Sequence, residues 1–183
     1  MFGLVLERIA AELDRRSIPY MVIGGQAVLV HGEPRLTRDI DVTLGMDTDR
    51  LPELEEAARA LGLQTLVDPR TFTPRTMVLP CLDPATGVRV DFILSFSPFE
   101  AEALRRAVTL QVGATPVRFV GVEDLVILKV VAGRPRDLED ARVLLHRHRS
   151  VDRTLIERWL RELGRALGAD FLGAYRSLLP PGT

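Results

Sequence analysis

Hydrophobic positions follow two different periods along the chain. Apolar residues in segment 2–16 recur at helical spacing, which indicates an amphipathic helix, and segments 26–31 and 47–61 also favour helix. Short apolar runs that favour extended structure lie at residues 18–23, 40–44, 63–67, 75–79, 88–96, 108–112 and 117–119. A proline-containing loop is expected between the runs at 63–67 and 75–79.

From residue 122 onward the pattern is helical throughout. Mixed elements followed by helices alone predict an α/β (α+β) fold, with a mixed β-sheet flanked by helices and a C-terminal helical subdomain. We therefore expect a core over residues 1–120 and a helical subdomain over residues 121–183 packed on that core. The sequence contains neither an internal repeat nor a low-complexity linker.

The two glycines at the start of segment 24–41 and the two aspartates at its end are the main chemical signal. Gly24 and Gly25 open a helix-like segment, where backbone amides bind anions readily. Asp39 and Asp41 alternate at the start of the next strand and so share one face. Two adjacent carboxylates repel each other and are stable beside a cation. Hard oxygen ligands of this kind suit Mg²⁺.

The ordered set Gly24, Gly25, Asp39 and Asp41, with Asp91 on a later strand, resembles the DNA polymerase beta-like nucleotidyltransferase superfamily. In that superfamily a Gly-Gly or Gly-Ser turn precedes Asp-x-Asp on a strand, and a third carboxylate follows. The resemblance implies a nucleotidyltransferase-type mixed sheet. It also implies that the three aspartates are catalytic and hold Mg²⁺ (or Mn²⁺).

A closer resemblance is to the AbiEii-type toxin nucleotidyltransferases. It adds Arg-x-Thr-x-Asp-Ile-Asp, a downstream lysine (Lys129) and an Arg-x-x-Asp-x-x-Asp set formed by Arg134, Asp137 and Asp140. This resemblance implies a transfer of a nucleoside monophosphate from a nucleoside triphosphate to an acceptor hydroxyl. The acceptor it suggests is tRNA or another RNA, and a cognate antitoxin is a possible partner.

The resemblance also assigns roles to individual residues. Gly24, Gly25 and Lys129 are expected to hold the β- and γ-phosphates of the nucleotide. Arg38 is a further candidate for nucleotide binding, because it flanks the carboxylates and arginine binds phosphate with two hydrogen bonds. Asp91 is expected to help deprotonate the acceptor.

Several of these residues have a second interpretation. Arg89 lies two residues from Asp91 on the same strand face, so the two could form a simple ion pair. Arg35 and Arg38 could clamp a triphosphate or merely balance acidic charge.

Lys129, the single lysine of the chain, lies in an apolar run and must either snorkel to water or meet an anion. If Lys129 meets a triphosphate, Lys129→Met should lower nucleotide affinity. It should keep or raise thermal stability, because removing the charge relieves its desolvation.

Composition limits the partners. The chain has 183 residues, 46% of them hydrophobic, and 24 basic and 25 acidic residues give a formal charge of −1. A polyanion must therefore bind through a local patch, for which the best candidate is Arg142, Arg147 and Arg149. No membrane-spanning or targeting segment stands out, so we expect a cytoplasmic protein.

Alternative functions remain open. The acceptor could be a small molecule or a protein, and related folds carry out both reactions. A catalytically silent nucleotide- or RNA-binding module is disfavoured, because binding alone does not require a repulsive acidic cluster. A metal-dependent phosphohydrolase is disfavoured by the lack of the histidines that such sites commonly use.

Overall fold

The computed structural model describes residues 2–32 and 37–179. These residues form two compact units: unit 1 comprises residues 2–27 and 37–120, and unit 2 comprises residues 28–32 and 121–179. Arg35, a candidate phosphate clamp, lies outside the described residues.

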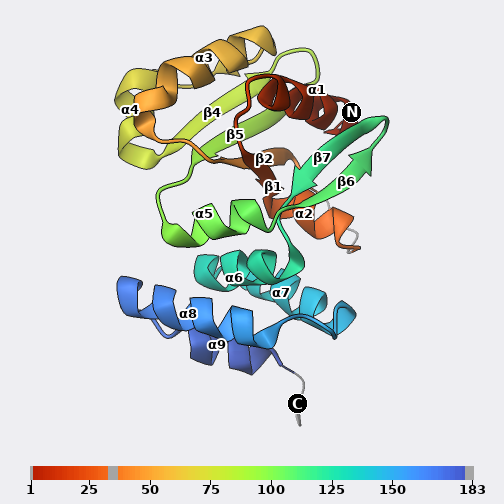
Figure 1. Ribbon diagram of the computed structural model, residues 1–183, viewed down its shortest axis with the longest axis vertical. Helices are drawn as coiled ribbons and strands as arrows, with labels where there is room; N and C mark the ends of the chain where they lie inside the picture. Colours follow the sequence, from red (N-terminus) through yellow and green to blue (C-terminus); the bar gives the residue numbers. More distant parts are fainter. Residues whose placement is uncertain (1, 33–36, 180–183) are drawn as a thin grey trace. The chain divides into compact units, whose positions relative to one another are not determined.

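Unit 1 is built on a mixed sheet of seven strands in the order β3-β4-β5-β2-β1-β7-β6 (Figure 1). In chain order the strands are β1 (Tyr20–Ile23), β2 (Asp39–Leu44), β3 (Gln64–Thr65), β4 (Val78–Asp83), β5 (Val88–Leu94), β6 (Val108–Val112) and β7 (Thr115–Phe119). The central strand β2 pairs antiparallel with β1 and parallel with β5. The chain thus brings β2 and β5, which are far apart in sequence, side by side.

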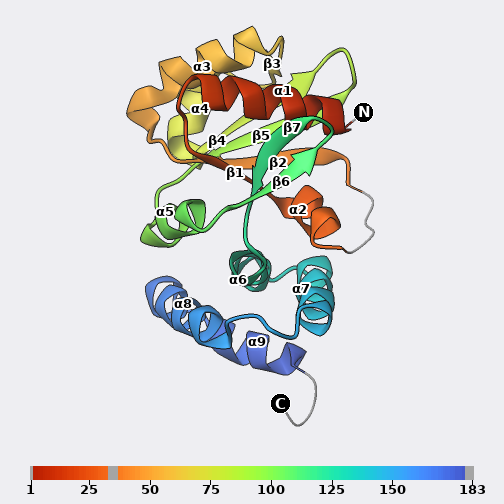
Figure 2. The same cartoon turned by 45° about the vertical axis from the view of Figure 1, so that its right-hand side comes forward.

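The helical elements of unit 1 lie on both faces of this sheet. They are α1 (Phe2–Arg15), the start of α2 (Gly24–Val30), the 3₁₀ turn η1 (Thr48–Arg50), α3 (Leu51–Ala60), α4 (Pro69–Thr76) and α5 (Pro98–Arg105). Figure 2 shows α1 and α3 together over one face and α5 on the other. The Arg118 guanidinium of β7 donates to the carbonyl oxygen of Leu104 at 3.1 Å, which ties α5 to the sheet.

Alternation along β2 and β5 separates a core face from a more open face. Val42 of β2 and Val90 and Phe92 of β5 are fully buried and belong to the core face. Asp41, next to Val42 on β2, and Asp91, between Val90 and Phe92 on β5, belong to the opposite face and are partly exposed. Burial of the aliphatic face fixes the register of each strand, because a slip of one residue would turn the aspartates into the core.

One local prediction was wrong. The segment expected as a proline-containing loop and the start of a strand forms α4, and β4 begins only at Val78. The Asp68 carboxylate accepts a hydrogen bond from the Arg70 amide, and Pro69 occupies the first turn, as in many helix starts. Met77, with a φ of 59°, ends the helix.

Unit 2 contains four helices that lie wholly within its described residues: α6 (Val122–Ala132), α7 (Pro135–Arg147), α8 (Arg153–Leu167) and α9 (Phe171–Leu178). Gly133, with a φ of 66°, separates α6 from α7 in the left-handed conformation that glycine adopts without strain. Most of α6 is buried, including Asp124 and Lys129. The α/β fold class predicted from the sequence is confirmed.

Across the described ranges, no helix has both the length and the apolar character needed to cross a membrane.

Candidate active site

Gly24 and Asp41 are in direct contact where β1 meets α2. Ile23 pairs with Asp41 across the antiparallel β1–β2 ladder, and Gly24 follows with a φ of +63°. A Cβ atom placed on Gly24 would lie 2.0 Å from Oδ2 of Asp41, far inside contact distance. Glycine is therefore required at position 24 both by the backbone conformation and by the carboxylate. Gly25 is buried in the first turn of α2.

The three predicted aspartates lie on one face of two neighbouring strands. Asp39 and Asp41 alternate on β2, and Asp91 is the register partner of Asp41 on the parallel strand β5. All three are partly buried. Parallel strands are spaced about 4.8 Å apart, so Asp41 and Asp91 start from adjacent backbone positions.

Arg89 belongs to the same group. It pairs with Asp39 in the β2–β5 register, and its Nε donates to Oδ1 of Asp91 at 2.9 Å. That hydrogen bond raises the pKa of Arg89, and the negative charges of Asp91, Asp39 and Asp41 raise it further. The guanidinium is thus within electrostatic reach of all three carboxylates. The ion pair between Arg89 and Asp91, one of the two interpretations of the sequence, is present.

The fit of a metal ion depends on the carboxylate orientations. Within residues 2–32 and 37–179, no three His, Cys, Asp or Glu side chains converge closely enough to enclose one. One oxygen of Asp91 is engaged by Arg89, and Oδ1 of Asp39 accepts a hydrogen bond from the Thr37 hydroxyl at 3.1 Å. The donor chemistry and the shared face suit a hard divalent cation, and Gly24 makes room for Asp41.

The sequence interpretation missed Gln26. Its side chain follows the glycine pair and is only 4% exposed, yet its Nε2 has no hydrogen-bond partner among the described residues. Buried polar groups without partners are uncommon and often mark functional positions. A polar residue at the start of the apolar segment 26–31 was the available signal. Arg38, in contrast, is exposed immediately before Asp39.

In unit 2, Lys129 is paired with two carboxylates. Its Nζ lies 2.8 Å from Oδ1 of Asp137 and 2.8 Å from Oδ2 of Asp140, and the Lys129 side chain is only 7% exposed. Arg134 pairs with the other oxygen of Asp137 at 2.5 Å. We call Lys129, Arg134, Asp137 and Asp140 the lysine cluster. Its geometry places the ammonium of Lys129 against the start of α7.

The charge pairing changes the pKa of Asp137. Burial raises the pKa of the Asp137 carboxyl, but hydrogen bonds from Arg134 and Lys129 outweigh burial and lower it below the ordinary value. The sequence-based expectation that Lys129→Met keeps or raises stability does not account for this pairing. With Lys129 removed, two buried carboxylates would lose their shared counter-charge.

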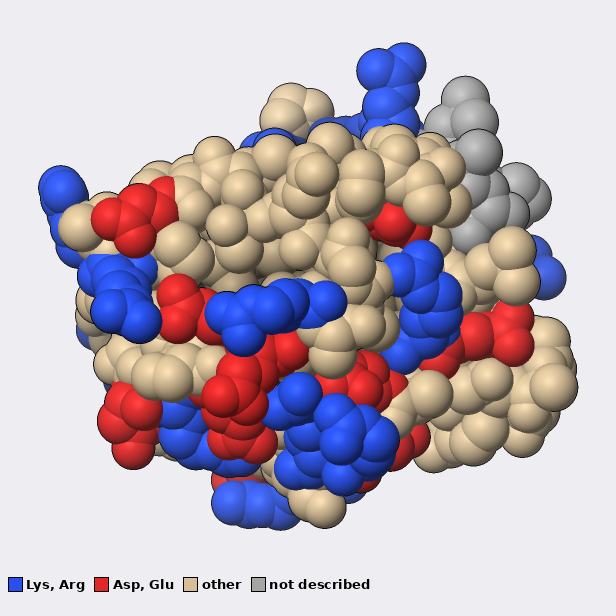
Figure 3. Space-filling view, turned by 90° about the horizontal axis from the view of Figure 1, so that it is seen from above, with Lys and Arg blue, Asp and Glu red and all other residues tan. Residues whose placement is uncertain are grey.

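The basic residues near the end of α7 are differently engaged. Arg142 pairs with Glu139 on the same helix. The guanidinium of Arg147 lies against Gly32, with Nε 2.5 Å from the position of a Cβ on that glycine. Arg149 is exposed beyond the helix end. On the face shown in Figure 3, basic and acidic side chains are interleaved, as expected from a net charge near zero.

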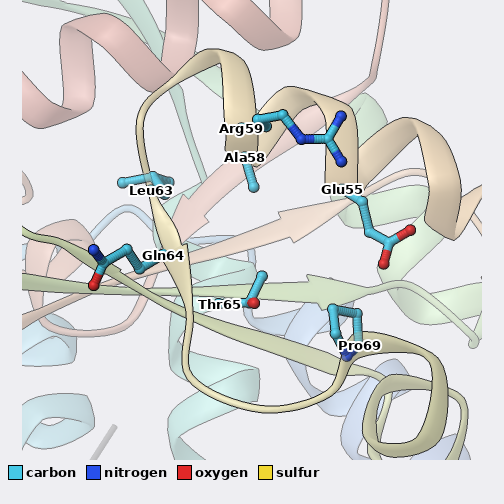
Figure 4. A pocket seen from close by; sticks show the side chains of 7 residues that line it. All are labelled: Glu55, Ala58, Arg59, Leu63, Gln64, Thr65 and Pro69. Atoms are coloured by element: carbon cyan, nitrogen blue, oxygen red, sulfur yellow. The ribbon is translucent and has the colours of Figure 1, made fainter.

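A pocket of about 560 Å³ opens elsewhere on unit 1, between α3, β3 and the start of α4 (Figure 4). It is lined by Glu55, Ala58, Arg59, Leu63, Gln64, Thr65 and Pro69. None of the predicted site residues lines it. The pocket is therefore separate from the residues that the sequence predicts to form the active site.

The seven-stranded mixed sheet and the Gly-Gly, Asp-x-Asp and third-aspartate arrangement define a nucleotidyltransferase. The family model described as nucleotidyl transferase AbiEii toxin, type IV TA system, matches residues 13–178. The chain therefore belongs to the AbiEii family of nucleotidyltransferase toxins. No curated protein matches it.

Solved structures establish the same fold. The antibiotic-resistance factor ANT(2'')-Ia shares 20% identity over 91% of this chain and 95% of its own, with a TM-score of 0.63. The lincosamide antibiotic adenylyltransferase LnuA shares 14% identity over 77% of this chain and 94% of its own, with a TM-score of 0.56. A nucleotidyltransferase-like protein from Paracoccidioides brasiliensis shares 16% identity over 95% of this chain and 91% of its own, with a TM-score of 0.56.

Proposed function

We propose that this enzyme is a metal-dependent nucleotidyltransferase that moves a nucleoside monophosphate from a nucleoside triphosphate to a hydroxyl of an RNA acceptor, in the cytoplasm. One observation carries the proposal: Asp39, Asp41 and Asp91 share the open face of β2 and β5, beside the Gly24 turn. Membership of the AbiEii family supports the reaction class and the toxin context.

The three aspartates would hold Mg²⁺ or Mn²⁺, which when bound stabilises the charge on the attacking and leaving oxygens. In the transfer, the acceptor oxygen forms a bond to the α-phosphorus, the bond to the β-phosphate oxygen breaks, and pyrophosphate leaves. The Asp91 carboxylate accepts the proton of the acceptor hydroxyl. Partial burial of Asp41 and Asp91 strengthens their interaction with cations relative to bulk water.

The nucleotide would be held beside this face by groups from α2 and the approach to β2. The backbone amides of Gly24 and Gly25 and the exposed guanidinium of Arg38 are the proposed phosphate donors. The buried amide of Gln26 is a further donor for the nucleotide, since Nε2 finds no partner among the described side chains and backbone. The phosphate contact of Lys129 stays a prediction, beside the pairing of its ammonium with Asp137 and Asp140.

The acceptor is proposed from the family and from local charge. Toxins of this family belong to type IV toxin–antitoxin systems, so a cognate antitoxin is a proposed partner. With a net charge of −1, RNA must be held by a local patch, and Arg149 is the exposed member that lies beyond the end of α7. Arg142 and Arg147 contribute charge from positions already in contact with Glu139 and Gly32.

Labelled transfer tests this proposal. The protein is incubated with Mg²⁺, each α-³²P nucleoside triphosphate in turn, and total RNA, and the products are separated on a gel. A discrete labelled RNA that disappears with EDTA and in Asp41→Asn is the expected result. Label on a protein or a small molecule would identify the alternative acceptors, and no label on any class would favour the catalytically silent module.

The basic patch is tested with a matched pair of charge reversals. Arg149→Glu should reduce RNA labelling and its salt dependence, because phosphate contacts release counterions. Arg70→Glu on α4, whose native side chain is 81% exposed, makes the same change in net charge and should leave labelling unchanged. Equal labelling by both variants would exclude Arg149 from the RNA site.

A further inference from the structure

We propose that Arg89 is a built-in counter-cation of the three aspartates and is displaced from Asp91 when a divalent metal binds. Arg89 would thereby act as a positioning residue that controls metal entry through Asp91. This inference rests on the metal site of the proposed function. It adds a competition between one arginine and the metal for the same carboxylate.

The geometry places Arg89 where the competition must occur. Arg89 and Asp91 share the open face of β5, and Nε of Arg89 lies 2.9 Å from Oδ1 of Asp91. Arg89 also pairs in register with Asp39 on β2. A metal held by all three aspartates needs Asp91, and the guanidinium on Oδ1 places a positive charge beside the position that the metal cation would take.

The two strands offer their aspartates to a metal in different surroundings. Asp41 lies against Gly24, whose lack of a Cβ leaves space for Oδ2. Asp91 is held by a partner whose own side chain is 53% exposed and can move into solvent. Asp91 is therefore the ligand that changes partner.

The exchange is energetically accessible. Exposed ion pairs contribute little to stability, because water and salt screen them and holding two side chains together costs entropy. A divalent ion has twice the charge of the guanidinium and can be reached by several oxygens at once. Removing Arg89 should therefore tighten metal binding by up to about fivefold, the range that a weak competing ion pair implies.

Metal binding without nucleotide tests the inference independently of catalysis. Mn²⁺ is titrated into the full-length protein and followed by electron paramagnetic resonance, for wild type, Arg89→Gln, Arg89→Lys and Asp41→Asn. Arg89→Gln should bind Mn²⁺ more tightly than wild type. Arg89→Lys, which keeps the charge but loses the planar fork, should fall between them. Equal or weaker binding by Arg89→Gln would overturn the inference.

Arg106→Gln is the matched control, because Arg106 pairs with Glu102 at the same distance of 2.9 Å and the variant changes net charge equally. If Arg106→Gln tightens Mn²⁺ binding as much as Arg89→Gln, the effect is general charge and the inference fails. If wild type and Arg89→Gln bind Mn²⁺ equally and Asp41→Asn does not bind it, the metal site is supported and only the role of Arg89 is contradicted. No Mn²⁺ binding by any variant would remove the metal site itself.

Thermal unfolding gives a second readout. In EDTA, Arg89→Gln should melt below wild type, because the three carboxylates lose a counter-charge. In millimolar Mg²⁺ its melting temperature should rise more than that of wild type, since tighter binding to the native state stabilises it more. If the ion pair between Arg89 and Asp91 were only structural, Arg89→Gln would melt below wild type by the same interval with and without Mg²⁺. That result would contradict the inference.

Discussion

The protein holds two clusters of acidic residues, and their surroundings differ sharply. In unit 2, Lys129 donates to Asp137 and Asp140 within a buried cluster whose three side chains are 7%, 4% and 10% exposed. In unit 1, Asp91 is paired with Arg89, whose side chain is 53% exposed, on a strand face shared with two more carboxylates. Both clusters place acids near a basic group. The ammonium shared by the two acids of unit 2 is buried, although Arg134, which also pairs with Asp137, is 76% exposed, whereas the guanidinium paired with Asp91 is accessible to solvent.

This difference separates a structural cluster from a reactive one. A buried ion pair must be satisfied internally, because a lone charge away from water is costly. The lysine cluster meets this requirement with two basic and two acidic side chains. The aspartates of unit 1 gather three negative charges on one face, an arrangement that gains stability from a cation and suits catalysis. Substitutions of the unit 1 aspartates should therefore lower activity more than stability, whereas substitutions in the lysine cluster should lower stability.

The largest expected effect is the loss of activity in Asp41→Asn. A neutral amide cannot replace a carboxylate that stabilises a divalent ion, so nucleotide transfer should fall by about 100-fold or more. The melting temperature should stay within a few degrees of wild type, because relief of carboxylate repulsion offsets the lost contacts. Activity assays with labelled nucleoside triphosphates and calorimetric melting measure the two quantities.

Asp49→Asn, an exposed carboxylate in η1, is the control for Asp41→Asn and should match wild type in both assays. If Asp41→Asn lowered the melting temperature strongly but kept its specific activity, the aspartates of unit 1 would be structural. The contrast between the two clusters would then disappear.

The reverse result is expected for Lys129→Met. Loss of the ammonium leaves Asp137 and Asp140 buried without their shared partner, which should lower the free energy of unfolding by about 3–5 kcal/mol. The triple variant Lys129→Met, Asp137→Asn, Asp140→Asn should recover part of that loss, because the charges are then removed together. Denaturant unfolding measures each value.

Arg142→Met on the same helix is the control for the lysine variants. Arg142 and Glu139 are 52% and 60% exposed, so breaking their pair should cost less than about 1 kcal/mol. A stability loss in Lys129→Met no larger than in Arg142→Met would show that the buried pairing contributes little.

Lys129 also shows where sequence reasoning stops. Its apolar surroundings along α6 were visible in the sequence, and they predicted that the charge is costly. The two carboxylates that compensate it come from α7, and only the packing of the two helices brings them within 2.8 Å. The sequence placed Asp137 and Asp140 three residues apart on one helix face and predicted that this face supports Lys129, which the structure confirms, but it could not show that both carboxylates pair directly with the ammonium.

The glycine–aspartate motif was more predictable, because local rules determine most of it. Strand alternation placed Asp39 and Asp41 on one face, and the fold class followed from the order of the hydrophobic patterns. The steric reason for Gly24 was out of reach, since it depends on the β1–β2 register that faces Asp41. The helix α4 was missed because Pro74 inside it suggested a loop.

Gly24→Ala tests the steric part of the site and should have an intermediate effect. The new Cβ would collide with Oδ2 of Asp41, so the variant should lose more than the roughly 1 kcal/mol that a left-handed alanine costs. Activity should fall with it, because Asp41 is displaced. Gly87→Ala is the matched control: it has a φ of +71° with nothing within 4 Å of its Cβ. Equal losses in stability and activity for the two alanines would remove the steric argument.

The smallest effect is the pH dependence of the lysine cluster. The pKa of Asp137 is lowered in the folded protein, so its unfolded chain binds a proton more readily. The stability that this carboxylate contributes is present above its ordinary pKa of 3.8 and is lost as the pH falls through the lower, folded value. The melting temperature of wild type should therefore stay a constant interval above that of Asp137→Asn while the pH is above 3.8, and should approach it as the pH falls below 3.8. Leu144→Ala, a destabilised variant on the same helix without a change in charge, should stay a constant interval below wild type. A constant interval for Asp137→Asn at low pH as well would show that its carboxylate is not held ionised by Lys129 and Arg134.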